Sequence, residues 1–189
     1  MADIQTLELL NYRKMPHASF DFYTFEKVID DSLAQRISLA SYMFNWGKIE
    51  GMRTDKHYRI WMNKYNAKSF RDTCRIFDAP KTKEVFSDIT GVDYSACRTR
   101  IELCKDEAGS WLHNHYDDKA KLFTLQLYLS DSSVSTSFNK QNTSATSGNG
   151  WFFANTAREL HGLNPLLERR ISLIVNYVDD TWRDNTVLV

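Results

Sequence analysis

Side chains that bind metals are concentrated in residues 111–129 of this 189-residue sequence, WLHNHYDDKAKLFTLQLYL. Two histidines and two aspartates fall within six residues, directly before an apolar, alternating run. In an extended segment, residues i and i+2 point to the same side. The imidazole of His115 and the carboxylate of Asp117 would therefore face one space, in which one ion fits. The spacing predicts a metal site at this pair.

A third ligand is available downstream in ELHGLNP, where His161 follows Asp117 by 44 residues. That separation allows the chain to leave through several strands and return. Two histidines and one carboxylate on one face form the ligand set of non-haem Fe(II) oxygenases, which leaves positions open for a co-substrate and O2. An HxD pair alone is a weak signal, because such tripeptides are common in surface loops.

His113 is the competing ligand, because it lies two residues before His115 and shares its face on a regular strand. His113, His115 and His161 would make a three-histidine site, as in cupins or zinc hydrolyases. A cupin normally adds a glutamate a few residues later, whereas aspartates follow here. We therefore expect His113 to stand beside the site without binding the metal, and Asp118 to face solvent.

A candidate anion-binding residue, Arg170 in RRISL, stands nine positions beyond His161. A fixed guanidinium suits bidentate pairing with a carboxylate. Ser172 shares the face of Arg170 on a strand, and Tyr128 can supply a phenol from a neighbouring strand. Arg169 would then point the opposite way, to solvent.

The first half of the chain is predicted to form helices and supporting strands. Apolar residues recur at helical spacing in FEKVIDDSLAQRISLASYMFNW and NAKSFRDTCRIF, and the end signals of APKTKEVFSDITG predict one more helix. Asp30 or Asp31 is a suitable N-cap for the first of these helices. Pro80 lies near the start of the last helix, and Gly91 lies just beyond its end.

From Arg98 the period changes to two, in RTRIELCK, KLFTLQLYL, VSTSF, WFFA and RRISLIVNYV. DEAG, after the first of these strands, is typical of a turn. Six or so short strands with turns between them predict an antiparallel sandwich or barrel. We expect one domain, with helices and supporting strands over residues 1–96 and a jelly-roll core over residues 97–180.

The composition is close to that of a soluble globular domain, with 42% hydrophobic and 25% charged residues. Lys+Arg and Asp+Glu are both 24, and this neutral charge argues against a duplex nucleic-acid partner. No apolar run approaches the roughly 18–20 residues of a membrane span. The start, MADIQTLELLNYRKM, lacks a signal pattern, and three cysteines without zinc spacing fit a reducing, cytoplasmic setting.

Residues 98–180 resemble the Fe(II)/2-oxoglutarate-dependent dioxygenase superfamily, in particular its prolyl-hydroxylase-like branch. The resemblance rests on an ordered set: a strand with a Gly turn, HYD, an apolar strand ending in YL, then TSF, WFF, HGLNP and R-x-S. It implies an α+β fold with a double-stranded β-helix (jelly-roll) core in the C-terminal half and an N-terminal helical buttress.

The resemblance implies that His115, Asp117 and His161 bind Fe(II) and that 2-oxoglutarate and O2 are co-substrates. The residues implied to bind 2-oxoglutarate are Arg170 at its distal carboxylate, Tyr128, Ser172 and Thr124. The implied activity is hydroxylation of an unidentified small molecule or peptide side chain, with release of succinate and CO2. Asp117 favours hydroxylation or desaturation over halogenation, because halogenating relatives lack this carboxylate.

Two alternatives remain open from the sequence: a three-His cupin-type metalloenzyme, and a non-catalytic jelly-roll binding protein with a structural metal. The strand that often opens with glycine in relatives reads SSVSTSFNK here, a departure on the substrate side. The segment GMRTDKHYRIWMNKYN is expected to flank the mouth of the site. It offers Arg53, His57, Tyr58, Arg59 and Trp61 as contacts.

Overall fold

The computed structural model describes residues 11–15, 22–48, 57–138, 141–156 and 159–189. In chain order, its elements are β1 (Asn11–Met15), β2 (Phe22–Glu26), α1 (Asp31–Ser41), β3 (Gly47–Lys48), β4 (His57–Trp61), η2 (Met62–Lys64), α2 (Lys68–Asp78), α3 (Pro80–Thr90), β5 (Arg98–Asp106), β6 (Leu112–His115), β7 (Lys121–Tyr128), β8 (Thr136–Phe138), β9 (Gln141–Asn142), β10 (Asn149–Ala154), β11 (His161–Leu163), β12 (Arg170–Val178) and η3 (Asn185–Val187).

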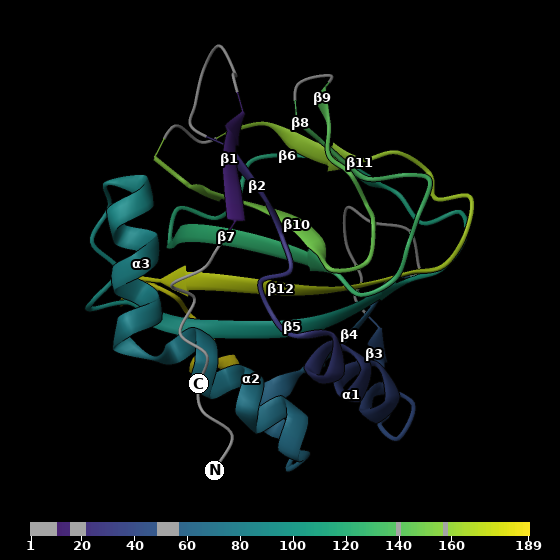
Figure 1. Ribbon diagram of the computed structural model, residues 1–189, viewed down its shortest axis with the longest axis horizontal. Coiled ribbons are helices and arrows are strands. Elements are labelled where there is room, and N and C mark those ends of the chain that lie inside the picture. Colours follow the sequence, from purple (N-terminus) through teal and green to yellow (C-terminus); the bar gives the residue numbers. More distant parts are fainter. Residues whose placement is uncertain (1–10, 16–21, 49–56, 139–140, 157–158) are drawn as a thin grey trace.

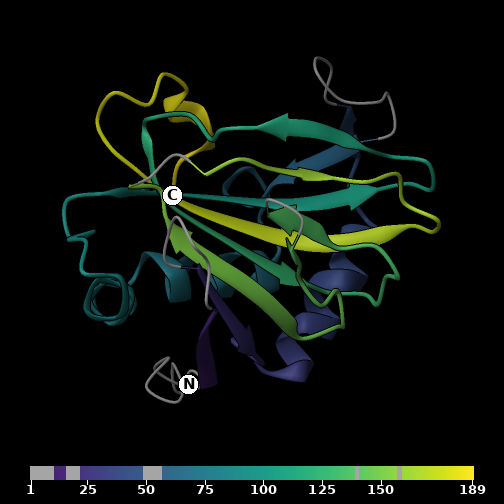
Figure 2. The same cartoon turned by 90° about the horizontal axis from the view of Figure 1, so that it is seen from above.

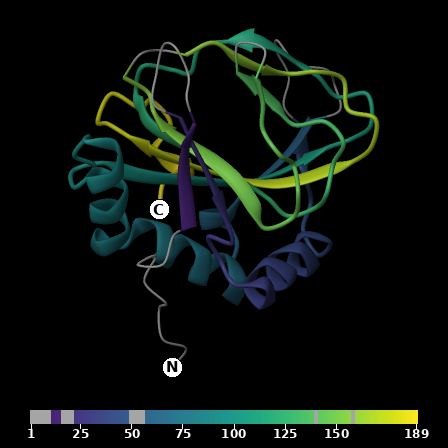
Figure 3. The same cartoon turned by 45° about the horizontal axis from the view of Figure 1, so that its top comes forward.

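Two antiparallel sheets form the core of the molecule. The major sheet has the strand order β1-β2-β10-β7-β12-β5-β4-β3, and the minor sheet has the order β6-β11-β8-β9. The minor sheet lies over one face of the long strands β7, β12 and β5, and the helices lie on the other face (Figures 1 and 3). A two-sheet antiparallel core of this kind is the jelly roll expected from the period-two half of the sequence.

Local signals fix the ends of the helices. The side chain of Asp30 caps α1 by accepting a hydrogen bond from the backbone N–H of Leu33 at 2.7 Å. Pro80 opens α3, and Gly91 ends it with a left-handed φ of 74°. Among the described residues, no helix is long and apolar enough to cross a membrane.

The long strands of the major sheet alternate in character along their length. One set of alternate residues packs with the helices in the main apolar cluster, and it includes Ile101, Leu103, Leu125 and Val175 with Phe77 and Phe86 of the helices. The other set points between the two sheets and is polar, and it includes Arg100, Glu102, Asp106, Gln126 and Arg170. Since β5 and β12 run side by side (Figure 2), their polar residues form one continuous floor.

Candidate active site

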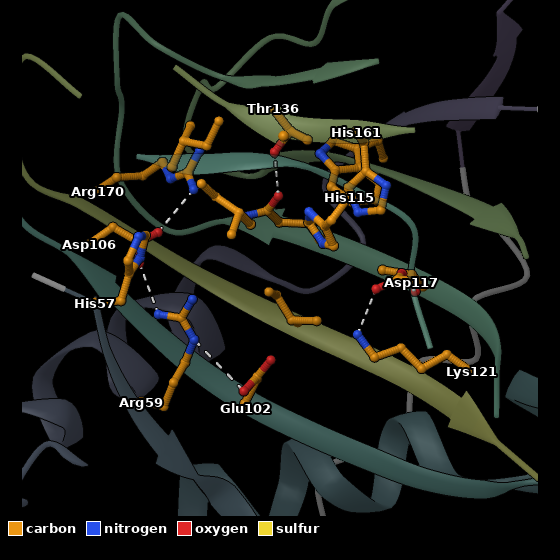
Figure 4. A pocket seen from close by; sticks show the side chains of 17 residues that line it. His57, Arg59, Glu102, Asp106, His115, Asp117, Lys121, Thr136, His161 and Arg170 are labelled. Carbon is orange, nitrogen blue, oxygen red and sulfur yellow. Dashed lines mark hydrogen bonds and ion pairs between the residues drawn. The ribbon is translucent and has the colours of Figure 1, made fainter. Parts of the chain in front are cut away.

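The three predicted ligands, His115, Asp117 and His161, come together between the sheets. His115 ends β6, His161 begins β11, and the two residues are paired across these strands. Asp117 follows β6 by two residues, and one ligand atom from each side chain lies within 4.8 Å of the others. Asp117 and His161 are buried, and His115 is half-buried (Figure 4). This cluster has the size and the donor set of a site for one metal ion.

Both histidines are oriented through the same ring nitrogen. Nδ1 of His115 lies 3.0 Å from the carbonyl oxygen of His113, and Nδ1 of His161 lies 3.1 Å from that of Glu159. A carbonyl accepts only, so each Nδ1 carries the hydrogen and each Nε2 keeps a lone pair for a metal. Burial, followed by the charge of His161, lowers the pKa of His115, which favours the neutral form that binds metals.

Two neighbours hold the carboxylate of Asp117. Lys121 donates to Oδ1 at 2.7 Å, and the hydroxyl of Thr124 donates to Oδ2 at 2.8 Å. Thr124 accepts in turn from the side-chain amide of Asn176 at 2.9 Å. Burial alone would raise the pKa of Asp117, but the charge of Lys121 holds the pKa well below its usual range. The carboxylate is therefore ionised, as a metal ligand must be.

The opposite end of the same pocket is cationic. Nη2 of Arg170 donates to Oδ2 of Asp106 at 2.9 Å, whereas Nε and Nη1 are buried and have no hydrogen-bond partner among the described residues. The guanidinium lies 5.6 Å from the centre of the Tyr128 ring. Buried donors without partners are costly. This end of the pocket is therefore suited to an anion with two acceptor oxygens.

The carboxylate of Asp106 accepts the hydrogen bonds that hold the basic side chains at this end of the pocket. Its Oδ1 accepts from Nδ1 of His57 at 2.7 Å and from Nη1 of Arg59 at 2.9 Å. Asp106 is the direct cross-strand partner of His57 on β4 and of Arg170 on β12. Burial would raise the pKa of Asp106, but Arg59, His57 and Arg170 hold it well below its usual range. Asp106 is therefore a buried carboxylate that is surrounded by three basic side chains.

A neutral polar floor separates the two ends. The amide nitrogen of Gln126 donates to the hydroxyl of Ser172 at 2.9 Å, and its amide oxygen accepts from the hydroxyl of Thr136 at 2.8 Å. Figure 4 shows Thr136 between Arg170 and the histidine pair. The empty space of the pocket is about 600 Å³ when its open mouth is included.

The structure places the other predicted residues as follows. Thr124 lines the pocket beside Asp117, and Ser172 lies beneath Gln126. The hydroxyl of Tyr128 is occupied in the apolar side of the core, where it accepts from Nε1 of Trp151 at 3.1 Å and bonds to Thr143 at 3.0 Å. Asp118 and Arg169 are exposed.

His113 does not join the metal cluster. Its side chain is exposed and packs edge-on against Trp111, with ring centroids 4.2 Å apart. The register between β6 and β11 shifts at this point, so that Leu163 pairs with Leu112. Leu112 lines the pocket in the position that regular strand parity gives to His113.

Sequence reasoning missed several pocket residues: Glu102, Asp106, Lys121, Gln126, Thr136 and Trp151. Gln126 lies on the same face of its strand as Thr124 and Tyr128, so the alternation of side chains could have identified it as a pocket residue. Asp106 was assigned to a turn, whereas it is the last residue of β5. His57 and Arg59, expected at the mouth, line the pocket from β4, and Arg53 lies outside the described residues.

Comparisons with known proteins identify the fold. No family model matches the sequence, and no curated protein matches it either. Solved structures do match. A prolyl-4-hydroxylase from Pseudomonas putida is 12% identical with a TM-score of 0.68, covering 86% of this chain and 94% of that one. A prolyl hydroxylase from Trichoplax adhaerens, solved with a hypoxia inducible factor peptide, is 13% identical with a TM-score of 0.65, covering 84% of each chain.

A third match has a different activity. The non-heme alpha ketoglutarate-dependent epimerase SnoN from nogalamycin biosynthesis is 14% identical with a TM-score of 0.61, covering 84% of this chain and 77% of that one. Another structure of this epimerase holds Fe3+ and alpha ketoglutarate. The chain thus has the fold that these prolyl hydroxylases and this epimerase share. The predicted jelly-roll core is confirmed.

Proposed function

We propose that this protein is an Fe(II)- and 2-oxoglutarate-dependent dioxygenase that hydroxylates an unidentified small molecule or peptide side chain. One observation carries the proposal: a His115–Asp117–His161 cluster and a buried, partly unpaired Arg170 line the same pocket. A metal site alone would fit many proteins, and so would a buried arginine. Together on this fold they match the two requirements of the co-substrate, a chelating metal and a cation for the distal carboxylate.

The donor set fits Fe(II). Two imidazole nitrogens and one carboxylate oxygen of borderline hardness suit a divalent iron and leave open coordination positions. Both imidazoles are already fixed in the tautomer that presents Nε2. Asp117 is held by Thr124 and Lys121, as ligand carboxylates usually are by hydrogen-bond donors. We assign His115, Asp117 and His161 as the metal ligands.

The charges of the pocket fit a dicarboxylate. Three cationic residues that line it, Arg59, Lys121 and Arg170, balance the three carboxylates Glu102, Asp106 and Asp117. A divalent metal and the protonated His57 would add positive charge, which a dianion such as 2-oxoglutarate offsets. We assign Arg170 to the distal carboxylate, with Gln126 and Ser172 forming the floor beneath the bound molecule and the Tyr128 ring packing beside the guanidinium.

Bound iron and 2-oxoglutarate would supply O2 chemistry in which 2-oxoglutarate becomes succinate and CO2 while a substrate C–H bond becomes C–OH. The residues of the protein would bind and position these groups. Arg170 binds and orients the co-substrate, and Lys121 and Thr124 keep Asp117 ionised and fixed. Leu112, Leu163 and other apolar side chains in the pocket lining offer contacts for a hydrocarbon group.

The positions of His113 and Asp117 also help to choose among the alternative functions. The three-His alternative needs the imidazole of His113, which is exposed and packs edge-on against Trp111. Asp117 also supports hydroxylation over halogenation. A reducing, cytoplasmic setting belongs to the proposal and is supported by Cys74, Cys97 and Cys104, which are buried and free.

The decisive experiment is anaerobic titration of the Fe(II)-loaded protein with 2-oxoglutarate, followed by visible absorption. We expect a weak charge-transfer band from the chelate, and none with glutarate, which lacks the keto group. In air, succinate should then form and should increase with the right substrate. Failure of the iron-loaded protein to bind 2-oxoglutarate would overturn the proposal. Binding without consumption, across a panel of peptides and metabolites, would favour the non-catalytic binding protein.

A further inference from the structure

Among the described residues, His57 is the one pocket-lining histidine that lies outside the His115–Asp117–His161 cluster. It is 1% exposed, at the start of β4, and belongs to neither the predicted ligands nor the co-substrate residues assigned above. Its Nδ1 lies 2.7 Å from Oδ1 of Asp106, and its Nε2 lies 2.9 Å from the carbonyl oxygen of Trp111. The ring thus bridges two parts of the site that are far apart in sequence.

Both partners of His57 are hydrogen-bond acceptors. Asp106 is ionised, because its pKa is held well below the usual range, and a backbone carbonyl can only accept. The ring satisfies both partners only with a hydrogen on each nitrogen, as an imidazolium. Each end of the ring therefore makes a charge-assisted hydrogen bond, which is stronger than a bond between neutral groups.

One end of the bridge reaches the co-substrate side of the pocket. Asp106 binds His57 and Arg59 through Oδ1 and Arg170 through Oδ2. Among the described residues, Asp106 is the one hydrogen-bond partner of the Arg170 guanidinium, with Nε and Nη1 left for a ligand. The position of the Asp106 carboxylate therefore decides where the free donors of Arg170 point.

The other end reaches the metal-bearing strand. Trp111 immediately precedes β6, which ends at His115. The turn before it is fixed by backbone bonds between Leu166 and the residues Gly109 and Ser110, and the side chain of His57 holds the next carbonyl, that of Trp111. Two residues further on, His113 accepts the hydrogen bond that orients His115.

We propose that His57 is a positioning residue that joins the anion-binding end of the pocket to the strand that carries the metal ligands. This inference rests on the proposed function, since it assigns metal to one end and 2-oxoglutarate to the other. Its two hydrogen bonds have separate effects: the bond to Asp106 supports co-substrate binding, and the bond to Trp111 supports metal binding.

Two replacements separate the two bonds. In His57→Asn the amide nitrogen takes the place of Nδ1 and keeps a donor for Asp106. In His57→Gln the amide nitrogen takes the place of Nε2 and keeps a donor for Trp111. Asp106 retains Arg59 and Arg170 in both variants. His113→Asn and His113→Gln are the matched controls on an exposed histidine.

Mn(II) replaces Fe(II) in the measurements, because it is stable in air. Mn(II) affinity is measured first, and 2-oxoglutarate affinity is then measured by calorimetry at saturating Mn(II). For His57→Asn we expect about tenfold weaker Mn(II) binding, typical for loss of support behind a metal ligand, with little change in 2-oxoglutarate affinity. For His57→Gln we expect about tenfold weaker 2-oxoglutarate binding at nearly unchanged Mn(II) affinity. The control variants should match the wild type.

Three outcomes overturn the inference: neither variant changes either affinity, both variants lose both affinities equally, or the pattern is reversed. Equal losses would mean that His57 only stabilises the fold, which circular dichroism and thermal unfolding of each variant would show in parallel. If one variant fails to fold, the other variant tests the inference by itself. An unchanged Mn(II) affinity in His57→Asn, or an unchanged 2-oxoglutarate affinity in His57→Gln, would then contradict the inference. If the wild-type protein binds Mn(II) but does not bind 2-oxoglutarate, the proposed function itself is contradicted.

Discussion

The two faces of the major sheet are made by alternate residues of the same strands, and they differ in almost every physical respect. Leu125 packs among apolar side chains from the helices, whereas its neighbour Gln126 bonds to Ser172 and Thr136 between the sheets. Ile101 and Glu102 show the same contrast on β5. Both faces are buried, so burial alone does not distinguish the part that stabilises the fold from the part that binds ligands.

The contrast indicates that one face of the major sheet stabilises the fold and the other face binds ligands. Apolar burial stabilises the fold by about 25 cal/mol per Å² removed from water, and the helix-covered face provides most of it. Buried charges carry a desolvation cost that their partners offset only when the geometry is good. The inner face keeps Asp106, Glu102 and three arginines despite that cost. We therefore expect changes on the helix face to alter stability, and changes on the inner face to alter binding.

The largest expected effect is on metal binding. Asp117→Ala removes a ligand and should weaken Mn(II) binding by more than about 100-fold, since losing even a supporting partner of a ligand costs about 10–100-fold. Titration of the folded variant with Mn(II), followed by the electron paramagnetic resonance of the free ion, measures it. Asp118→Ala, at the exposed neighbour, should bind as the wild type does. Tight binding by Asp117→Ala would favour a site built from histidines.

On the helix face, Leu125→Ala should lower the free energy of unfolding by about 2–5 kcal/mol, because Leu125 is fully buried and its truncation leaves a cavity. Urea unfolding measures the loss. The Mn(II) affinity of the folded variant should stay within about twofold of the wild type. Leu39→Ala, at a leucine that is 60% exposed, should change stability by less than about 0.5 kcal/mol. A parallel loss of metal affinity in Leu125→Ala would break the division between the faces.

Arg170→Met should weaken 2-oxoglutarate binding by about 10–100-fold, because the hydrogen bonds of a charged group contribute about 1.5–3 kcal/mol. Mn(II) affinity should not change, since the guanidinium acts at the other end of the pocket. Calorimetry at saturating Mn(II) is the measurement. Arg169→Met is the control, because the two arginines are adjacent and only Arg170 is buried. Equal behaviour of the two variants would exclude Arg170 as the co-substrate residue.

A smaller effect is expected from Thr124→Val, which keeps the shape of the side chain and removes the hydroxyl that donates to Asp117. Mn(II) binding should weaken by about tenfold, as for other supporting partners of metal ligands. Lys121 still bonds to Asp117 in this variant, which limits the loss. A loss as large as that of Asp117→Ala would mean that Thr124, and not Lys121, orients the carboxylate.

The smallest effect is expected from His113→Ala. The imidazole is exposed and contributes only its backbone carbonyl to the orientation of His115, and alanine keeps that carbonyl. Mn(II) affinity should change by less than about twofold. A tenfold or larger loss would revive the three-histidine site and would contradict the assignment of Asp117 as the carboxylate ligand.

The sequence predicted that His115, Asp117 and His161 lie together and that Arg170 lies near them, because the order of these residues along the chain indicated it. It could not predict which residue of β6 besides His115 lines the pocket, since the register shift between His161 and Leu163 places Leu112 there and leaves His113 exposed. It also could not predict the buried network around Asp106. A period of two shows that a strand has two faces, and three-dimensional packing decides whether the polar face is solvated or enclosed.

Asp106 is the cross-strand partner of both His57 and Arg170, and this pairing limits how the chain length can change. Deleting a single residue within β5 would turn Arg100 and Glu102 toward the helices and bring Ile101 and Leu103 into the pocket, because side chains alternate at every step. Insertions and deletions are therefore tolerable in β5 only in pairs. Alignments of distant homologues that keep the strand free of single gaps should recover the site even where hardly any residue is identical.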